Sequence, residues 1–312
     1  MIPPKDVVSP DMNDWYKLVE CVPNFSEGRD KAKMERIIDC FRGVEGVRLL
    51  DYSNDVNHNR MVVTAVGSPE FMKKAVLNAI GTAVREIDLN QHRGEHPRMG
   101  TADVVPFVPI RNMTMDEAVL LAREVAAEAS KAFDLPVYLY EKAASAPHRK
   151  NLADVRKGQF EGLALKMEDP RWKPDFGPSK PHPTAGATII GARNFLIAWN
   201  VNLNTYNLEV AKVIAQKIRF SSGGFPCVKA LGIYLADKKL AQVSMNLTDF
   251  TQTSMLKVYT CIREEAAARG VSIAYSEIIG MLPIAALTGT TVQELQIDDF
   301  GPNRILENCL IE

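Results

Sequence analysis

The chain is poor in histidine, cysteine and tryptophan, and it has no excess of either charge. Its 312 residues include five histidines, five cysteines and three tryptophans. The 37 basic and 38 acidic side chains leave a formal net charge of −1. No overall field would therefore attract nucleic acid or an anionic membrane, and we expect neither as a partner.

Long apolar runs are also missing. The longest, residues 278–287, has ten residues and includes a proline, about half of what a membrane-spanning helix needs. Residues 1–14 carry three prolines and alternating charges, without the apolar centre of a signal peptide. We therefore predict a flexible extension over residues 1–15 and a cytoplasmic protein.

The cysteines and histidines give no pattern of a metal site. The cysteines are odd in number and widely spaced, unlike a disulfide framework or a zinc clip. His92 and His96 stand four residues apart, but no cysteine lies near them. The signatures of phosphate-binding loops, dinucleotide-binding folds, zinc proteases and serine hydrolases are missing too. We expect reduced thiols and no bound metal.

What the chain does contain is a hydrophobic content of 46%, enough to bury a core, and its length favours two. In the first half, hydrophobic periodicity and turn residues predict a strand, a helix, two strands, a helix and a strand. This is the β-α-β-β-α-β order of a ferredoxin-like sandwich. The predicted ranges are 17–22, 29–41, 44–51, 60–66, 68–87 and 103–108.

The first half continues with a long helix and one more strand. Thr114 and Glu117 form the pattern of a capping box that opens a helix over 115–133. A last strand is predicted at 136–140. The proline-rich residues 142–187 are expected to form loops and short helices.

The second half repeats the same order of elements without evident sequence identity. Its predicted ranges are 194–200, 208–219, 228–235, 241–245, 255–268 and 271–275. The fold class is therefore α/β, of the α+β kind, with two ferredoxin-like subdomains over 16–193 and 194–312. Because pockets concentrate between domains, we expect a ligand site between the halves.

The densest polar cluster is residues 90–100, in the loop before the strand at 103–108. Its His96 could take and give a proton near neutral pH, because the ordinary pKa of histidine lies close to that range. Glu95 or another carboxylate could orient the ring. A solvated polar turn would have the same composition, so the residues alone leave both interpretations open.

Two other segments could bind a ligand. The first is the predicted loop 51–60, where Arg60 could clamp a substrate carboxylate; an Asx-rich turn with a structural ion pair is the alternative. The second is the Gly/Pro-rich segment 177–186 at the boundary between the halves. A linker stiffened by proline would look the same.

Five stretches of the sequence resemble the formiminotransferase domain family, whose members occur alone in bacteria and fused to a cyclodeaminase domain in animals. They are LVECVPNFSEG at 18–28, GEHPRMG at 94–100, PVYLY at 136–140, PDFGPS at 174–179 and LAQVSMNL at 240–247. The resemblance covers residues 16 to 312 and is to the stand-alone bacterial type without the cyclodeaminase domain.

The resemblance implies glutamate formimidoyltransferase activity in histidine degradation. The formimino group of N-formimino-L-glutamate would pass to N5 of tetrahydrofolate, the co-substrate, and glutamate would leave. The family places the folate in a tunnel between two ferredoxin-like subdomains, needs no metal and forms a homodimer. By the family motif His96 is the catalytic general acid/base, and a pKa near neutrality would suit both of its proton transfers.

The family's folate-binding segment corresponds to ten residues here. They are Gly177, Pro178, Ser179, Lys180, Pro181, His182, Pro183, Thr184, Ala185 and Gly186. Residues 181–185 replace an aromatic residue and a tryptophan of the animal pattern. Asn24, Arg60, Arg98 and Asp51 are further candidates for substrate binding, because both substrates carry carboxylates that need a cationic partner.

Two other functions fit the same residues. One is a folate-binding carrier or regulatory protein that has no turnover. The other is a transferase of the same type that uses a formyl donor, which differs by one oxygen in place of one NH at the reacting carbon. The sequence does not separate these donors, because a single hydrogen bond would discriminate between them.

Overall fold

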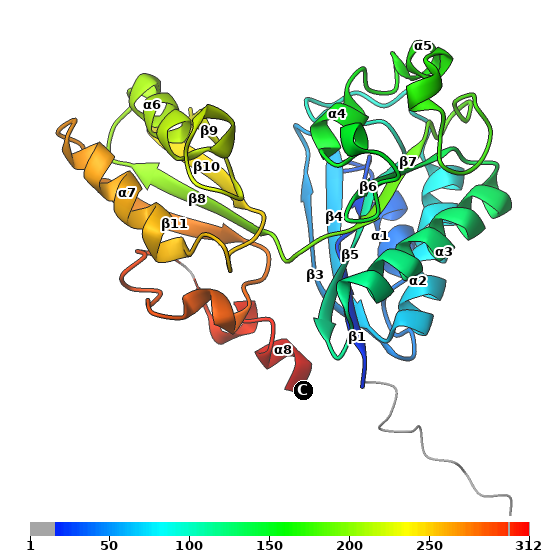
Figure 1. The fold of residues 1–312 in the computed structure, drawn as a ribbon, viewed down its shortest axis with the longest axis horizontal. Coiled ribbons are helices and arrows are strands. Elements are labelled where there is room, and N and C mark those ends of the chain that lie inside the picture. The colour runs from blue at the N-terminus through cyan, green and yellow to red at the C-terminus, as the bar shows by residue number, and fades with distance from the viewer. Residues whose placement is uncertain (1–15, 299, 312) are drawn as a thin grey trace, which may run out of the picture. The chain divides into compact units, whose positions relative to one another are not determined.

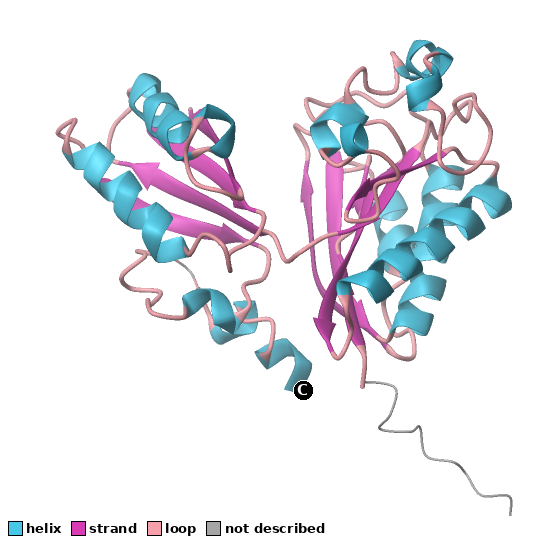
Figure 2. Ribbon diagram, in the orientation of Figure 1, coloured by secondary structure: helices cyan, strands magenta, loops and turns pink. Residues whose placement is uncertain are grey.

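The computed structural model describes residues 16–298 and 300–311, so the predicted extension over 1–15 lies outside the described residues. The chain forms two compact units, which meet in sequence between Arg193 and Asn194 (Figures 1 and 2). Unit 1 precedes that boundary and unit 2 follows it.

Unit 1 is built on a seven-stranded sheet. Its middle strands β1 and β2 follow each other along the chain and pair with β4 on one side and β5 on the other. β3 pairs with β4, whereas β7 and then β6 extend the sheet beyond β5 in the parallel direction. The strands are β1 (Leu18–Cys21), β2 (Asn24–Phe25), β3 (Val47–Asp55), β4 (Arg60–Gly67), β5 (Ala102–Arg111), β6 (Val137–Glu141) and β7 (Thr188–Ala192).

Three helices cover one face of this sheet (Figure 1). They are α1 (Lys31–Ile38), α2 (Pro69–Glu86) and α3 (Met115–Phe133). Their buried residues pack on the inward side chains of the strands, such as Phe25, Met61 and Phe107. α3 begins with the predicted capping box, in which the Thr114 and Glu117 side chains each accept the other's backbone N–H.

The opposite face of the sheet carries a smaller apolar cluster. Because side chains alternate along a strand, Tyr138 and Tyr140 of β6 point to this face, and they pack with Leu163. The covering elements are η1 (Pro147–Arg149), α4 (Leu152–Arg156), α5 (Leu163–Glu168) and η2 (Pro170–Trp172). They form the predicted region of loops and short helices.

Unit 2 is a four-stranded antiparallel sheet in the order β11, β8, β10, β9. Trp199 of β8 stacks on Tyr259 of α7 in its core, with ring centroids 6.0 Å apart. Its elements are β8 (Ile197–Leu203), α6 (Leu208–Ile218), η3 (Phe220–Ser222), β9 (Val228–Leu235), β10 (Leu240–Leu247), α7 (Met255–Ala267), β11 (Ile273–Ile279), η4 (Ile284–Leu287), η5 (Pro302–Arg304) and α8 (Asn308–Ile311). The prediction of two ferredoxin-like units is confirmed.

Several details differ from the sequence prediction, among them the short strand β2 and the later end of β11, at Ile279. β3 continues to Asp55, so Asp51 lies in a strand and only residues 56–59 form the turn. β7 was not predicted, because a fully buried strand that follows a Pro/Gly-rich segment shows no alternation of polar and apolar residues. The first strand of unit 2 begins at Ile197, three residues later than expected.

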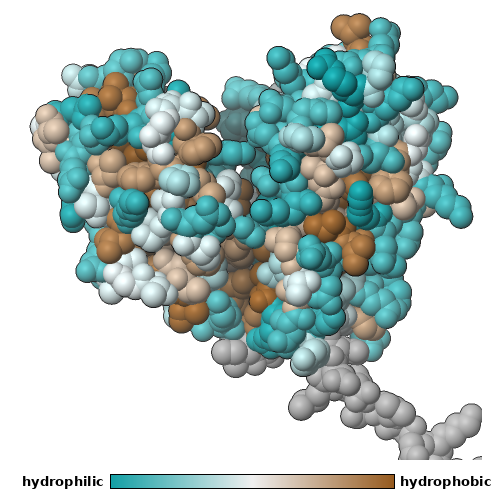
Figure 3. Space-filling model, in the orientation of Figure 1, coloured by the Kyte–Doolittle hydropathy of each residue, from teal (hydrophilic) through white to brown (hydrophobic). Residues whose placement is uncertain are grey.

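The surface is mostly polar in the view of Figure 3, with apolar residues in scattered patches. The edge strand β9 exposes Leu231, Ile233 and Tyr234. None of the helices described in this chain combines the length and the apolar character needed to span a membrane.

Candidate active site

The loop between α2 and β5, residues 87–101, carries His96 and is fixed by a buried histidine. The Nε2 atom of His92 lies 2.8 Å from the Asn59 carbonyl oxygen, and its Nδ1 accepts a hydrogen bond of 3.2 Å from the Arg98 guanidinium. Since a guanidinium only donates, His92 is neutral and donates through Nε2. Burial also lowers the pKa of His92. This ring therefore joins the loop to the β3–β4 turn.

The same turn contacts the loop at two further points. Asn59 has a left-handed backbone, with φ of 49°, and its side-chain amide donates to the Arg93 carbonyl at 3.0 Å. A Cβ atom at Gly94 would lie 2.2 Å from the His58 carbonyl oxygen. Only glycine allows so close an approach of the two backbones.

His96 is half-buried and lies against this turn. Its ring meets that of His58 edge to face, with centroids 6.1 Å apart. Burial, followed by the positive charges of Arg60 and Arg156, lowers the pKa of His96 to about 3. The expectation of a pKa near neutrality is therefore wrong for the chain without substrate, because burial and then the two arginine charges disfavour the protonated ring. The imidazole is neutral throughout the physiological range.

Asn24 and Arg60 lie on the sheet face opposite to helices α1–α3, since their strand neighbours Phe25 and Met61 point into the helix-covered core. The Arg60 guanidinium donates to the Asn24 side-chain oxygen, and the Asn24 amide donates to the Val22 carbonyl at 2.9 Å. Burial and the nearby charge of Arg156 lower the pKa of Arg60 to about 10. Arg60 is therefore still a cation at neutral pH.

Sequence reasoning did not single out Arg156 or its partner Asp103. Arg156 ends α4, and its Nη2 lies 2.8 Å from Oδ2 of Asp103. The other oxygen of Asp103 accepts the backbone N–H of Met99 at 2.6 Å and of Gly100 at 3.3 Å. Asp103 therefore connects Arg156 to the end of the His96 loop. No motif marks an arginine on a five-residue helix, so the sequence carries no signal for it.

Two other predicted residues are placed differently. Arg98 is buried and donates two parallel hydrogen bonds, of 2.8 and 2.7 Å, to Glu161. Its guanidinium therefore already has a carboxylate partner within the chain. Asp51 is exposed on β3, opposite Thr64 of β4. The structure thus groups Asn24 and Arg60 with His96, whereas Arg98 holds the loop in an ion pair.

The segment 177–186 lies beside the His96 loop. His182 and Gly186 close a tight turn through mutual backbone hydrogen bonds of 2.9 and 3.1 Å. The turn then binds both ends of the loop, because its carbonyls at Thr184 and Ala185 accept the N–H groups of Leu89 and Thr101. The predicted folate segment and the predicted catalytic loop are therefore hydrogen-bonded neighbours.

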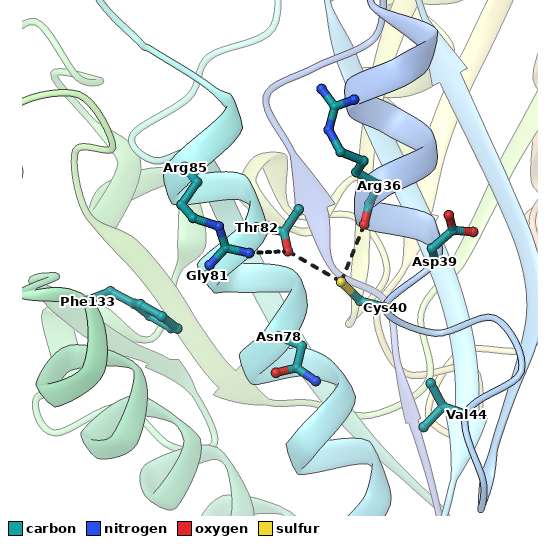
Figure 4. A pocket seen from close by; sticks show the side chains of 9 residues that line it. All are labelled: Arg36, Asp39, Cys40, Val44, Asn78, Gly81, Thr82, Arg85 and Phe133. Atoms are coloured by element: carbon teal, nitrogen blue, oxygen red, sulfur yellow. Dashed lines mark hydrogen bonds between the residues drawn. The ribbon is translucent and has the colours of Figure 1, made fainter.

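A hollow of about 460 Å³ lies elsewhere, on the helix-covered side of unit 1 (Figure 4). Its Cys40 Sγ is 3.5 Å from the Arg36 carbonyl and from the Thr82 hydroxyl, and Arg85 donates to that hydroxyl at 3.0 Å. Its lining consists of Arg36, Asp39, Cys40, Val44, Asn78, Gly81, Thr82, Arg85 and Phe133. None of the predicted site residues belongs to it.

Among residues 16–298 and 300–311, no cluster of three or more His, Cys, Asp or Glu side chains is arranged to hold an ion.

Two family models of the formiminotransferase domain match consecutive parts of the chain. The family model of the formiminotransferase domain, N-terminal subdomain, matches residues 18–193, and that of the formiminotransferase domain matches residues 198–296.

Two relatives have nearly the same length as this chain. A glutamate formimidoyltransferase of Streptococcus pyogenes serotype M1 is 45% identical over 296 residues, which are 95% of this chain and 99% of the relative. One of Thermoplasma acidophilum is 47% identical over 93% of this chain and 96% of its own length.

A longer relative matches in part. The formimidoyltransferase-cyclodeaminase of Rattus norvegicus is 42% identical over 87% of this chain, which spans 51% of that protein. With both family models matched and this identity over almost all of its length, the chain belongs to the formiminotransferase domain family.

Proposed function

We propose that the chain is a glutamate formimidoyltransferase, which transfers the formimino group of N-formimino-L-glutamate to N5 of tetrahydrofolate and releases glutamate. The family membership and the names of the two relatives of similar length support this activity. The structural observation that carries it is a neutral histidine, His96, flanked by Arg60 and Arg156 and standing in the loop that is hydrogen-bonded to the segment 177–186.

His96 acts first as a base and then as an acid. As N5 of tetrahydrofolate forms a bond to the amidine carbon, the neutral imidazole takes the proton that N5 loses. The tetrahedral intermediate then breaks its bond to the glutamate nitrogen, and the imidazolium returns the proton to that nitrogen. Atoms and charge balance over the two steps, and glutamate leaves as a neutral amine before it equilibrates with water.

Different residues around His96 bind the two substrates. The segment from Gly177 to Gly186 contacts tetrahydrofolate, and Arg60 with Asn24 binds the donor. Asp51 and Arg98 were also predicted to bind substrate; of these, Arg98 would first have to leave Glu161. The reaction belongs to histidine degradation, takes place in the cytoplasm, needs no metal and is carried out by a homodimer.

The test is an absorbance assay for 5-formiminotetrahydrofolate with formiminoglutamate and tetrahydrofolate. We expect turnover by the intact chain, its loss in His96→Gln and its retention in His148→Gln, whose ring lies against Trp172. Folate binding, measured by calorimetry, is expected to persist in both variants. Turnover with only a formyl donor, or tight folate binding without any turnover, would overturn this function in favour of the formyl-donor enzyme or the carrier.

A further inference from the structure

The two arginines near His96 differ in their partners. After burial, which is the largest cause, the charges of Arg60 and Arg156 lower the pKa of His96, and the charge of Arg156 also acts on Arg60. Arg156 is paired with Asp103 at 2.8 Å. The Arg60 guanidinium instead donates to a neutral group, the amide oxygen of Asn24, and forms no ion pair with the described residues. Arg60 is therefore the cation beside His96 that lacks a paired carboxylate.

The two arginines also have unused donors. The Nε atoms of Arg60 and Arg156 are both buried, and neither has a hydrogen-bond partner among the described residues. A buried donor without a partner costs free energy, so such groups in native structures are commonly satisfied by a ligand or water. Two such donors, one of them on an arginine that has no ion-pair partner, match a carboxylate, which accepts several hydrogen bonds.

We propose that Arg156 joins Arg60 in binding a carboxylate of the glutamate part of the formimino donor, and that His96 becomes an effective base only when this carboxylate is in place. The proposal rests on the proposed function and assigns a second arginine to the same site. Arg156 is the residue that it adds.

The donor supplies this carboxylate for a chemical reason. In N-formimino-L-glutamate the α-carboxylate is attached to the carbon that bears the glutamate nitrogen, the leaving group, and its carbon is three bonds from the amidine carbon. In tetrahydrofolate the carboxylates are separated from N5 by the aminobenzoyl group. When N5 and the amidine carbon meet at His96, the donor's carboxylate is therefore the anion nearest to the base.

Binding the carboxylate changes the proton affinity of His96. The charged and titratable groups that act on the ring are Arg60 of β4, Arg156 of α4 and His58 of the β3–β4 turn; Asp103 pairs with Arg156, and Asp55 lies beside His58. A negative charge placed on the arginines offsets their field, which is the second cause of the low pKa of His96 after burial, and therefore raises that pKa from about 3. After the imidazolium has returned its proton to the glutamate nitrogen, departure of glutamate reverses the change and leaves His96 neutral.

The direct test is an NMR titration of the histidine rings in the full chain, with the His96 signal assigned through His96→Gln. In the absence of substrate we expect His96 to stay neutral to below pH 5. L-Glutamate, the product, is expected to raise its pKa by about one unit or more. Arg156→Gln is expected to raise the pKa without glutamate and to abolish the response to glutamate.

The matched control is Arg171→Gln, since Arg171 is an exposed arginine on η2 that pairs with Asp169. This control is expected to titrate like the intact chain. Arg156→Lys keeps the charge but loses the fork of donors, so its His96 should stay neutral to low pH while glutamate binds more weakly. Circular dichroism checks that each variant is folded.

Kinetics supply a second readout. We expect Arg156→Gln to raise the KM for formiminoglutamate about tenfold or more and to leave the KM for tetrahydrofolate within about twofold, since a charge-assisted contact to one substrate is lost. A rise in the KM for tetrahydrofolate alone, or a His96 titration that neither glutamate nor Arg156→Gln alters, would overturn the proposal.

The two experiments separate the proposed activity from the proposed carboxylate site. If glutamate shifts the His96 titration but the chain does not turn over formiminoglutamate, the carboxylate site is supported and the assigned activity is wrong. If the chain turns over formiminoglutamate, and Arg156→Gln changes neither the donor KM nor the His96 titration, the activity is supported and the carboxylate site is wrong.

Discussion

Arg98 and Glu161 form an ion pair with two hydrogen bonds, of 2.8 and 2.7 Å, between the His96 loop and the segment that follows α4. The carbonyl of Arg98 also accepts the backbone N–H of Phe160 at 2.9 Å. Arg156 ends α4 only five residues before Glu161. This pair therefore helps to set the distance between the base and the second arginine.

The two partners of this pair differ in burial, so their loss should have unequal effects. Arg98 is 7% exposed, whereas the Glu161 side chain is 63% exposed. Glu161→Gln is expected to cost less than about 1 kcal/mol, because the released guanidinium keeps its bond to His92. Arg98→Met leaves the buried His92 ring nitrogen without a donor and should cost about 1–3 kcal/mol of unfolding free energy. Urea unfolding measures both, and equal losses would contradict this assignment.

The close approach at Gly94 gives a second prediction. Gly94→Ala places a methyl group against the His58 carbonyl oxygen, 2.2 Å from the new Cβ, so the His96 loop must move away from the β3–β4 turn. We expect kcat to fall at least about tenfold, since displacement of a catalytic group by about 1 Å has large effects. Steady-state kinetics measure this loss.

The control for that variant lies next to it in the chain. Glu95→Ala changes an exposed side chain and keeps the backbone hydrogen bond from Glu95 N–H to the Asn57 carbonyl, at 3.2 Å. Its kcat should stay within about twofold of the intact chain. A large loss in Glu95→Ala would instead assign its carboxylate a role at His96, and an active Gly94→Ala would show that the loop tolerates displacement.

The sequence predicted structure correctly where the pattern that determines it lies within a few neighbouring residues. Thr114 and Glu117 predicted the start of α3 to the residue, because a capping box is formed within one turn of the chain. β7 was not predicted because it forms by pairing between β5 and β6 and is buried there, and this burial exists only in the assembled sheet.

The same distinction holds for the candidate site. A histidine in a polar loop beside a proline is visible in the sequence, and His96 remains the predicted base. Arg156 is not visible, because it meets His96 only after α4 has packed on the sheet face opposite to α1–α3. The low pKa of His96 was unpredictable for the same reason, since its causes are burial in the folded chain and then the charges of Arg60 and Arg156 on β4 and α4.

Glu20 on β1 gives a prediction about stability and pH. It is 1% exposed, and burial raises its pKa to about 7, against the opposing charge of Arg193. Between its ordinary value of 4.5 and about 7, the folded chain binds this proton more tightly than the unfolded chain does. Stability from this group is therefore complete below pH 4.5 and is lost as the pH rises through 7.

The measurement is urea unfolding of the intact chain and of Glu20→Gln at pH 4.5 and pH 8. Relative to the variant, the intact chain is expected to lose about 3 kcal/mol between these two pH values, since each pKa unit corresponds to about 1.4 kcal/mol. The difference between the two proteins cancels the titration of all other groups. A difference that does not vary with pH would show that folding does not raise the pKa of Glu20.

Lys166 holds the end of α4, the helix that carries Arg156. Its ammonium donates to the carbonyls of Asp154 at 2.9 Å, of Val155 and of Lys157 at 3.1 Å. It thereby satisfies carbonyl groups that a helix end leaves without intrahelical partners.

Lys166→Met keeps an apolar chain of similar length over the Trp172 ring and removes all three donors. We expect a loss of about 1–2 kcal/mol in urea unfolding. We also expect the KM for formiminoglutamate to rise about threefold to tenfold, because α4 no longer holds Arg156 in one position. The KM for tetrahydrofolate should not change, and Lys166→Arg, which keeps the charge and the donors, should recover most of both losses. A destabilised Lys166→Met with an unchanged donor KM would show that Arg156 is positioned by Asp103 alone.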